Sequence, residues 1–581
     1  MAQPTTWRAR RTNFMDRVHA RKAGRRAAAT AFVSAPEPRT IGNVSRGKQL
    51  ISGNFLFSGF LIEDPDLSIW DIAANNPIVS DEIHGCTWLD DLAAVGTEQA
   101  RLQAQAWVFD WIIRYGKGSG PGWTPDVVAR RLIRLINHGL FLLRGQEKTS
   151  SVLFFQNLDR QCSFLSRRWK TAPPGLPRFE ALAGTIHAGL SLKGMDAPVN
   201  QAVAALTKDC GTHIDADGTI ATRNPEELLE ILSLLNWTIQ ALTENNRPVP
   251  ATFLDAVARI VPTLRALRHA DGGLARFHGG DVGADGRLDS ALVASGIKDL
   301  SKHPLQMGFL RLTGGRTTLI VDADSPPSGA ASAGAHASTL GFELTSGRRP
   351  IIVNCGAGQQ FGDEWRRASR ATPSHTTLGI EGFSSSTLAP AGTVGGPELL
   401  SDIPTHVLCN TTVADGFRKA ELSHNGYQPS HGLTHGRILR MSVDGRNLEG
   451  EDILAALDKT DESVLDRAVG QTAMQGIPFT IRFHLHPDVE PTLDMGKTAV
   501  GLTLNSGEVW VLRHDGTVEM SLAPSVYLEN GRLKPRTSQQ VVLTGRAMSY
   551  ATRIRWTLAK AHNTPDVVRD FAEDDPIDLI D

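Results

Sequence analysis

The stretch that decides the fold reads Leu-Gln-Met-Gly-Phe-Leu-Arg-Leu-Thr-Gly-Gly-Arg-Thr-Thr-Leu-Ile-Val-Asp at residues 305–322. Its apolar spacing has a period of two, and the pair Gly314-Gly315 separates two runs, a pattern that predicts a β-hairpin. The same arrangement returns at 339–354 around Ser346-Gly347 and at 499–513 around residues 505–507. Hairpins that recur at this spacing indicate an antiparallel β-sandwich over the second half of the chain.

Upstream of this stretch the apolar spacing is helical. Thr124-Pro125-Asp126 and Asn224-Pro225-Glu226 each place a capping residue before a proline, the usual start of a helix. Apolar stripes with a period of about 3.6 follow both starts and recur from about residue 60 to 300, joined by short connections rich in Gly and Pro. The pattern predicts antiparallel helical hairpins, and we expect the change from helices to strands at 300–308.

Composition excludes several classes of protein. The chain has 581 residues, 41% of them hydrophobic and 21% charged, which fits a globular protein of several domains. With 60 Lys and Arg against 62 Asp and Glu, the net charge of −2 argues against a dedicated nucleic-acid binder. The five cysteines are scattered without a C-x-x-C pair, which argues against a disulfide scaffold or a four-cysteine zinc site. The sequence contains no run of about 18 apolar residues, so it does not predict a transmembrane helix.

The two ends of the chain differ in charge. Residues 1–48 form a basic arm without an apolar stretch of signal-peptide length, so no cleavable secretion signal is evident. Two interpretations of the arm stay open: a frayed, solvated amphipathic helix, or a segment that lies on an anionic membrane or polysaccharide. Residues 561–581 form an acidic tail. We therefore expect a helical domain at 49–304 and a β domain at 305–560 between the two ends.

The densest polar constellation follows the first predicted hairpin. It holds His336 within Gly-Ala-His-Ala-Ser, then Asn354-Cys355-Gly356, and then Arg370-Ala-Thr-Pro-Ser-His375. This run resembles the start of the C-terminal domain of the heparinase II/III family of polysaccharide lyases. Three later segments and one in the helical half are also similar to that family: Gly432–Arg437, Leu448–Asp452, Ile481–Pro487 and, more loosely, Asp217–Pro225.

The resemblance implies a helical (α/α) toroid followed by an antiparallel β-sandwich. It also implies a carbon–oxygen lyase that cleaves an acidic, uronate-containing polysaccharide such as a glycosaminoglycan by β-elimination. That chemistry needs a base for the proton beside the uronate carboxylate, a cation or donor for the carboxylate, and an acid for the leaving oxygen. The family implies a place in the cell envelope or periplasm, while the missing signal keeps the cytoplasm as the alternative.

The sequence departs from the family pattern at the acid/base positions. The family's H-x-H-x-D maps onto Gly334, His336 and Ser338, so the first His and the Asp are absent. The family's toroid Tyr falls at Glu227. These departures favour the alternative of a non-catalytic glycan-binding or cell-envelope protein that retains the lyase fold. A third interpretation, a glycoside hydrolase, would use carboxylates such as Asp217 and Glu227.

For a lyase, we expect His336, His375, Arg370 and Tyr427 to form the catalytic set. The guanidinium of Arg370 would neutralise the uronate carboxylate, since its geometry suits two parallel hydrogen bonds. The chain has four tyrosines, and Tyr427 is the one that falls in a polar segment before a predicted strand. We expect Tyr427 to transfer the proton from a loop beside a cleft, with its pKa lowered by Arg370.

The resemblance also raises zinc as a cofactor. In some relatives the ion is held at positions that map to His336, Asn354 and His375, and the neutral Asn is a weaker ligand than the Asp found there. We expect these three residues to converge in space, either as a metal site or as a structural cluster. The expected partner is an acidic polysaccharide, and the oligomeric state stays open.

Overall fold

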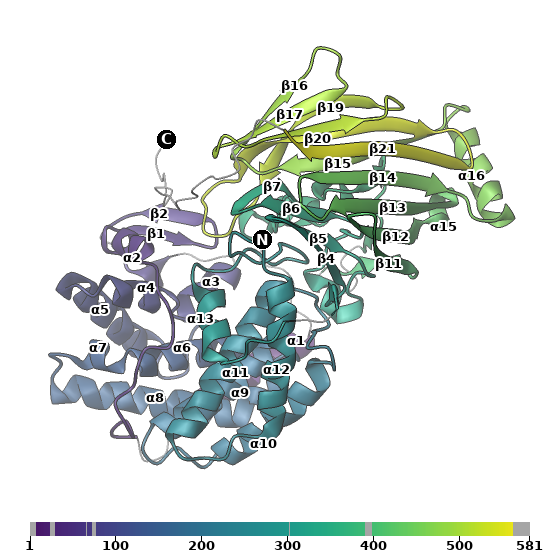
Figure 1. Ribbon diagram of the computed structural model, residues 1–581. Helices are drawn as coiled ribbons and strands as arrows, with labels where there is room; N and C mark the ends of the chain where they lie inside the picture. Colours follow the sequence, from purple (N-terminus) through teal and green to yellow (C-terminus); the bar gives the residue numbers. More distant parts are fainter. Residues whose placement is uncertain are drawn as a thin grey trace.

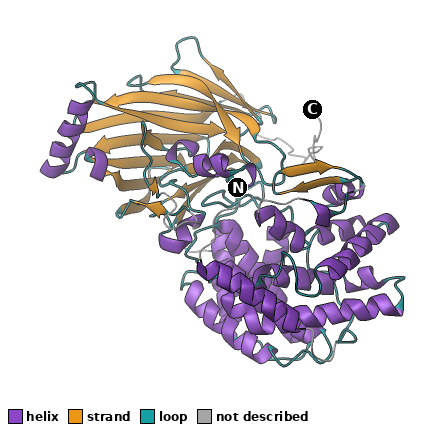
Figure 2. Ribbon diagram, turned by 180° about the vertical axis from the view of Figure 1, so that it is seen from behind, coloured by secondary structure: helices purple, strands orange, loops and turns teal. Residues whose placement is uncertain are grey.

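The computed structural model describes residues 7–23, 29–65, 67–72, 77–300, 303–389 and 398–561. A helical body and a β body lie side by side, as Figure 1 and, from behind, Figure 2 show. The predicted fold class, a helical toroid followed by an antiparallel β-sandwich, is confirmed. Within the part of the chain that is described, no helix has the length and apolar character needed to cross a membrane.

The helical body contains α1 to α13, and ten residues, 295–304, separate the end of its last helix from the first strand of the sandwich, which begins at Leu305. The bounds are α1 Trp7–Ala23, α2 Val44–Ile51, α3 Pro77–His84, α4 Trp88–Val95, α5 Glu98–Arg114, α6 Pro125–Asn137, α7 Gly139–Leu143, α8 Lys148–Arg168, α9 Leu176–Ser191, α10 Val199–His213, α11 Pro225–Glu244, α12 Ala251–Ala266 and α13 Arg287–Ala294.

The two predicted helix starts are those of α6 and α11. Asn224 caps α11, since its side-chain oxygen accepts hydrogen bonds from the backbone N–H groups of Glu226 and Glu227 at 2.9 and 3.1 Å. Thr124 precedes α6 in an extended conformation and makes no capping hydrogen bond, so Pro125 at the first helical position sets that start. Helix α9 packs against α6, α10 and α11, which buries the apolar stripes that the sequence displays.

Two large antiparallel sheets make up the sandwich. One runs in the order β11-β12-β13-β14-β21-β18-β17-β16 and the other in the order β19-β20-β15-β7-β6-β5-β4-β3, with β8 also paired to β15. The first sheet comprises β11 Val407–Ala414, β12 Phe417–Tyr427, β13 Leu433–Ser442, β14 Asn447–Ala455, β16 Val489–Leu493, β17 Ala499–Leu504, β18 Val509–His514 and β21 Ala551–Lys560. The second comprises β3 Leu305–Gln306, β4 Phe309–Gly314, β5 Thr317–Asp322, β6 Phe342–Ser346, β7 Arg349–Val353, β8 Leu378–Ile380, β15 Ile477–Leu485, β19 Glu519–Tyr527 and β20 Arg536–Ala547.

Aromatic side chains fill the space between the two sheets. Phe342 of β6 stacks on Trp556 of β21 with ring centroids 6.0 Å apart, and Phe483 of β15 meets the same indole edge-on. Gly450 of β14 lies against this indole, because a β-carbon there would come within 2.0 Å of the Trp556 ring. The three hairpins predicted from period two are β4–β5, β6–β7 and β17–β18.

Several strands and short helices were not predicted from the sequence. Strands β1 Asn54–Phe57 and β2 Phe60–Glu63 form a hairpin beside the helical body, with four residues each, too few for a clear period. The β half also contains α14 Asp363–Ser369, α15 Gln428–His431, α16 Lys459–Gln471 and the short pair β9 Thr387–Leu388 and β10 Leu400–Ser401.

Parts of both terminal segments can be placed. In the basic arm, α1 packs along α8, where Asp16 accepts a hydrogen bond from Arg168 at 2.6 Å. Of the acidic tail, residues 562–581 lie outside the described residues.

Candidate functional site

Three loops of the sandwich bring the predicted site residues together where the two bodies meet. His336 follows a 3-10 helix at Gly329–Ala333, Asn354 follows β7, and His375 follows a 3-10 helix at Thr372–Ser374. The Nδ1 atom of His336 lies 3.0 Å from the Nε2 atom of His375.

Asn354 lies next to this pair of histidines. Its Oδ1 atom accepts a hydrogen bond at 3.0 Å from the backbone N–H of Thr376, the residue after His375. A β-carbon on Gly341 would lie 3.4 Å from His375 and 3.7 Å from Asn354, so both residues border the same small space. The expected convergence is therefore found for His336 and His375, Asn354 lies beside them, and all three side chains are buried.

The hydrogen bonds define where the ring protons sit. The Nδ1 atom of His375 lies 3.0 Å from the carbonyl oxygen of Ala371, which only accepts, so this nitrogen carries the proton. The Nε2 atom of His375 then accepts the Nδ1 proton of His336. The remaining nitrogen of His336, Nε2, has a free lone pair and no hydrogen-bond partner among the described residues.

A third histidine, which the sequence reasoning missed, comes from the helical half. The Nδ1 atom of His278 accepts the backbone N–H of His336 at 3.3 Å, and its Nε2 atom lies 3.5 Å from Oδ2 of Asp322. His278 has a positive φ of 49° and directly precedes Gly279-Gly280. The two glycines are the sequence signal that could have pointed to His278, since a Gly pair marks a tight turn.

Burial keeps this histidine cluster neutral. Loss of contact with water lowers the pKa of His375 to about 4, helped by the nearby charge of His484. Burial also lowers the pKa values of His336 and His278 well below the ordinary range, and the neighbouring histidines add to the effect. Imidazoles with such low pKa values are weak bases at neutral pH.

The predicted role of Arg370 is wrong for this structure. Its guanidinium is buried and donates hydrogen bonds to three backbone carbonyls, those of Ala335 at 2.7 Å, Glu398 at 2.9 Å and Ser332 at 2.8 Å. Burial and the charge of Arg366 lower its pKa to about 10. Arg370 therefore fastens the loop that carries His336, and its side chain is buried rather than open to a carboxylate of a glycan.

The expected position of Tyr427 is also wrong. The residue is the last one of β12, fully buried in the sandwich core, and not part of an open loop. Its hydroxyl donates a hydrogen bond to the Leu378 carbonyl at 3.1 Å. Burial raises the pKa of Tyr427, and Arg370 is not among the groups that counter the rise. The buried hydroxyl is thus unsuited to proton transfer with a glycan.

The residues at this site do not fit a zinc ion. The two imidazole nitrogens that face each other share a hydrogen bond, and the Asn354 carbonyl oxygen is engaged by Thr376. No carboxylate or thiolate completes the set, and no group of three His, Cys, Asp or Glu side chains in the described ranges is arranged to hold a metal. Structural zinc sites use such anionic or imidazole ligands, four in all.

Two arginines of the helical half form hydrogen bonds to the sandwich across the junction between the two bodies. Arg223, in the segment that resembles the family, donates to Asp322 at 2.6 Å and to the carbonyls of Met307, Gly308 and Ser325 at 2.7 to 2.9 Å. Asp322 also accepts a hydrogen bond from Ser338, two residues after His336, at 2.7 Å. The arginine thus ties the start of the sandwich, and the loop of His336, to the helical half.

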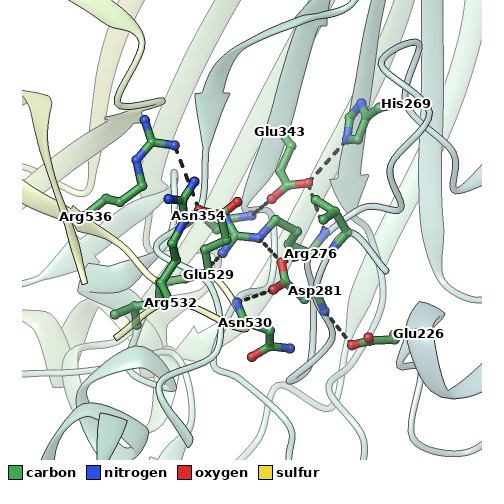
Figure 3. A network of polar contacts seen from close by, with 12 residues as sticks. Glu226, His269, Arg276, Asp281, Glu343, Asn354, Glu529, Asn530, Arg532 and Arg536 are labelled. Carbon is green, nitrogen blue, oxygen red and sulfur yellow. Dashed lines mark hydrogen bonds and ion pairs between the residues drawn. The ribbon is translucent and has the colours of Figure 1, made fainter. Parts of the chain in front are cut away.

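Figure 3 shows the second set of polar contacts across the junction, which is centred on Arg276. Its Nε atom donates to Asp281 at 3.1 Å, its backbone N–H donates to Glu343 at 3.0 Å, and its guanidinium bonds to the carbonyl of Leu528. Glu343 also contacts His269 at 3.3 Å and the Asn354 amide at 3.4 Å. Burial favours protonation of Glu343, but the bonds from His269 and the charge of Arg276 outweigh it, so its pKa is lowered.

Little space remains inside this network. A cavity lined by His269, Arg276, Glu343 and Tyr527, among others, has a volume of about 20 Å³. That is room for about one water molecule, whereas pockets for small organic ligands hold roughly 300–1,000 Å³. A sugar residue does not fit here without movement of the two bodies.

A second cluster of buried polar groups, which we call the sandwich cluster, consists of His424, His435, Arg437 and Asp452. Asp452 accepts hydrogen bonds from Arg437 at 2.7 Å and from His435 at 2.8 Å, and His435 contacts His424 at 3.2 Å. Arg437 reaches on to the carbonyls of Leu340 and Thr376, at 2.8 and 2.9 Å. The sandwich cluster therefore positions the loops that carry His336 and His375.

Comparison with known proteins agrees with this architecture. Residues 298–557 match the family model "Heparinase II/III-like, C-terminal". Among curated proteins, FtsZ-localized protein C of Caulobacter vibrioides is 28% identical over 544 residues, which cover 90% of this chain and 89% of that protein.

Solved structures share the fold over nearly the whole chain. Heparinase III superposes with a TM-score of 0.68 at 13% identity, covering 95% of this chain and 90% of that one. A mutant of heparan sulfate lyase HepC from Pedobacter heparinus gives 0.56 at 14% identity, covering 94% and 88%. Residues 298–557 are therefore a heparinase II/III-like C-terminal domain, and the chain shares the fold of the polysaccharide lyases over both halves.

Proposed function

We propose that this chain is a non-catalytic protein of the heparinase II/III fold that binds an acidic glycan of the cell envelope and acts where FtsZ assembles. The observation that carries the proposal is the state of the acid/base groups. His336 and His375 are buried and hydrogen-bonded to each other, Tyr427 lies in the core, and glycine occupies position 334. β-Elimination needs a group that reaches the proton beside the carboxylate, and none of these is placed to do so.

The closed junction supports the same conclusion. In this fold a substrate would have to reach His336 between the two bodies, where Arg223 and Arg276 bridge them. A glycan would therefore bind on the outer surface. The family fold favours an acidic polysaccharide as the ligand.

The relative's name supports the place of action. FtsZ-localized protein C matches 90% of this chain, and we infer that this chain also localises with FtsZ. A fluorescent fusion imaged together with labelled FtsZ tests this inference, and cell fractionation distinguishes an envelope or periplasmic location from the cytoplasmic alternative. A diffuse signal independent of FtsZ would contradict it.

The decisive experiment separates binding from cleavage. The purified chain is incubated with a panel of uronate glycans while the ultraviolet absorbance of the unsaturated product is followed, and binding to the same glycans is measured in parallel. We expect binding without product. Product that disappears in a His336→Gln variant would instead establish a lyase.

One observation favours that second candidate, β-elimination at the junction. The Nε2 atom of His336 has a free lone pair, so it could accept a proton if the two bodies separated. His375 would then steady the imidazole through the hydrogen bond between the two rings. In that case His375→Gln should also lower the rate, by roughly 10²–10⁴-fold for the loss of acid/base assistance.

A further inference from the structure

The paths of the two large sheets end in four strands, and these ends are not equally protected. An edge strand exposes unpaired N–H and C=O groups, which proteins commonly protect with charges, prolines or short length. Strand β16 contains Glu490 and Pro491, β19 contains Glu519 and Pro524, and β3 has two residues. Strand β11 reads Val-Leu-Cys-Asn-Thr-Thr-Val-Ala, eight residues without a charge or a proline.

Strand β11 is also apolar and open to solvent. Leu408 is 61% exposed and Val413 is 74% exposed. Figure 1 places the strand at the margin of its sheet, with β12 as its neighbour on one side. A long, uncharged, apolar edge strand of this kind is suited to pairing with a strand of another chain.

The turn after β11 determines which backbone groups are free. Asp415 and Gly416 link Ala414 to Phe417, and their φ values of 52° and 76° are those of a two-residue hairpin turn. In such a hairpin the flanking pair is hydrogen-bonded, and every second residue along the strand then bonds to the partner strand. The N–H of Asn425 donates to the His406 carbonyl at 3.3 Å, which follows the same alternation.

By this alternation the N–H and C=O groups of Val407, Cys409, Thr411 and Val413 point toward the open edge. The structure records no other backbone partner for them within the described part of the chain. Four residues with free backbone groups, evenly spaced, are what an antiparallel strand requires for pairing.

We propose that β11 pairs with β11 of a second copy of this chain, antiparallel, about a twofold axis at Asn410. In this register Val407 lies opposite the partner's Val413, and Cys409 lies opposite the partner's Thr411. All four edge residues of each strand exchange hydrogen bonds, and the half-buried Val407 and the exposed Val413 become a cross-strand apolar pair.

The strand is complementary to its own copy, which is the condition for a twofold interface. Because β11 has no charge, the two copies do not repel each other along the shared edge. The two eight-stranded sheets then form one continuous sheet. This dimer is independent of the glycan and of FtsZ, so its test stands apart from that of the proposed function.

The first experiment measures the mass of the full chain in solution by light scattering and analytical ultracentrifugation over a range of concentrations. We expect a dimer in equilibrium with monomer. Thr411→Lys should lower the association constant by about tenfold or more, since charges then meet at the shared edge. The matched control is Thr492→Lys, an exposed threonine on β16 at the other edge of the same sheet, which should leave the constant unchanged.

A second variant guards against misfolding. In Thr411→Pro the lost N–H is one that points outward, so the hydrogen bonds between β11 and β12 are retained while the intermolecular ladder is broken. We expect a folded monomer, with circular dichroism like that of the wild type.

Cross-linking tests the register. The partner's Asn410 lies opposite Asn410, in a non-hydrogen-bonded pair with a Cα separation of about 4.5 Å, which is within disulfide range. Asn410→Cys combined with Cys409→Ser should therefore form an intermolecular disulfide under mild oxidation. Thr412→Cys in the same background lies opposite the partner's Leu408 and should not. The other four cysteines are buried and do not interfere.

Three results would overturn the proposal: a wild-type chain that stays monomeric at every concentration, a dimer that survives both changes at Thr411, or a dimer that Asn410→Cys does not cross-link. Capture of a strand from another protein at β11, in place of a second copy, would overturn it as well.

Discussion

The two buried groups of histidines in this protein differ in the partners to which they are hydrogen-bonded. In the sandwich cluster, His435 and Arg437 meet the carboxylate of Asp452. Burial acts to raise the pKa of Asp452, but the charge of Arg437 and the bond from His435 outweigh it, and the pKa is lowered. The sandwich cluster is charge-balanced.

The junction pair, His336 and His375, ends instead on a backbone carbonyl, that of Ala371. Among the residues that the structure describes, no carboxylate is hydrogen-bonded to either ring, and burial lowers both pKa values. The sandwich cluster holds the loops through an arginine–carboxylate pair, which the junction pair lacks. Acid can disturb the neutral junction pair, as it can His424 of the sandwich cluster, because burial lowers the pKa values of all three histidines.

The largest effect should follow from breaking the charge balance of the sandwich cluster. Arg437→Met leaves Asp452 ionised and without its cation in the core, and we expect a loss of about 3–5 kcal/mol in the free energy of unfolding. Denaturant titration measures it. Arg440→Met on the same strand is the control, because Arg440 pairs with Glu449 at 2.7 Å with a side chain that is 41% exposed. It should cost less than about 1 kcal/mol. Equal losses in the two variants would contradict the comparison.

Acid should disturb the junction pair next. The pKa of His375 is 6.5 in a model peptide and about 4 in the folded chain, so its contribution to stability is complete above about pH 6.5 and is lost as pH falls toward 4. Between about pH 7 and about pH 5 we expect a loss of about 2 kcal/mol from this residue.

Denaturant titration at the two pH values checks this expectation in the wild type and in His375→Gln. The variant cannot take up the proton, so its stability should change less with pH. An identical pH dependence in both proteins would show that the junction pair is not acid-sensitive.

A smaller effect should come from the tyrosine that the sequence placed in a catalytic role. Tyr427→Phe removes one buried hydrogen bond, to Leu378, and should cost about 1 kcal/mol while glycan binding stays unchanged. Tyr550→Phe is the control, since that side chain is 45% exposed, and it should change stability by less than about 0.5 kcal/mol. Loss of a lyase activity in Tyr427→Phe, without loss of folding, would restore the catalytic role.

The smallest expected effect is that of zinc. A metal that binds the folded state stabilises it, so a zinc site would raise the thermal midpoint. Nδ1 of His336, Nε2 of His375 and the carbonyl oxygen of Asn354 are hydrogen-bonded within the protein, which leaves Nε2 of His336 as a single donor at this site. We therefore expect neither zinc nor a chelator to shift the midpoint. Bound zinc at one equivalent, lost in His336→Gln, would contradict the geometry.

Much of the architecture could be predicted because it depends on local patterns. The hairpin at 305–322 and the helix start at Asn224 follow from residue spacing and turn chemistry over a few positions. The convergence of His336 and His375 was also within reach, since both follow strands or turns of one sheet. The β1–β2 hairpin was not, because its strands are too short to show a period.

The amino-acid sequence by itself determined the order of helices and strands, the resemblance to a polysaccharide lyase family, and the loss of the family's first His at Gly334. Only the tertiary structure decided what the remaining polar residues do. Arg370 and Tyr427 read as polar and accessible in the sequence, yet both are buried and bonded to backbone carbonyls. His278 reaches His336 from 58 residues away. The physical reason is that burial and long-range partners set a side chain's pKa and reach, and neither follows from its neighbours in the chain.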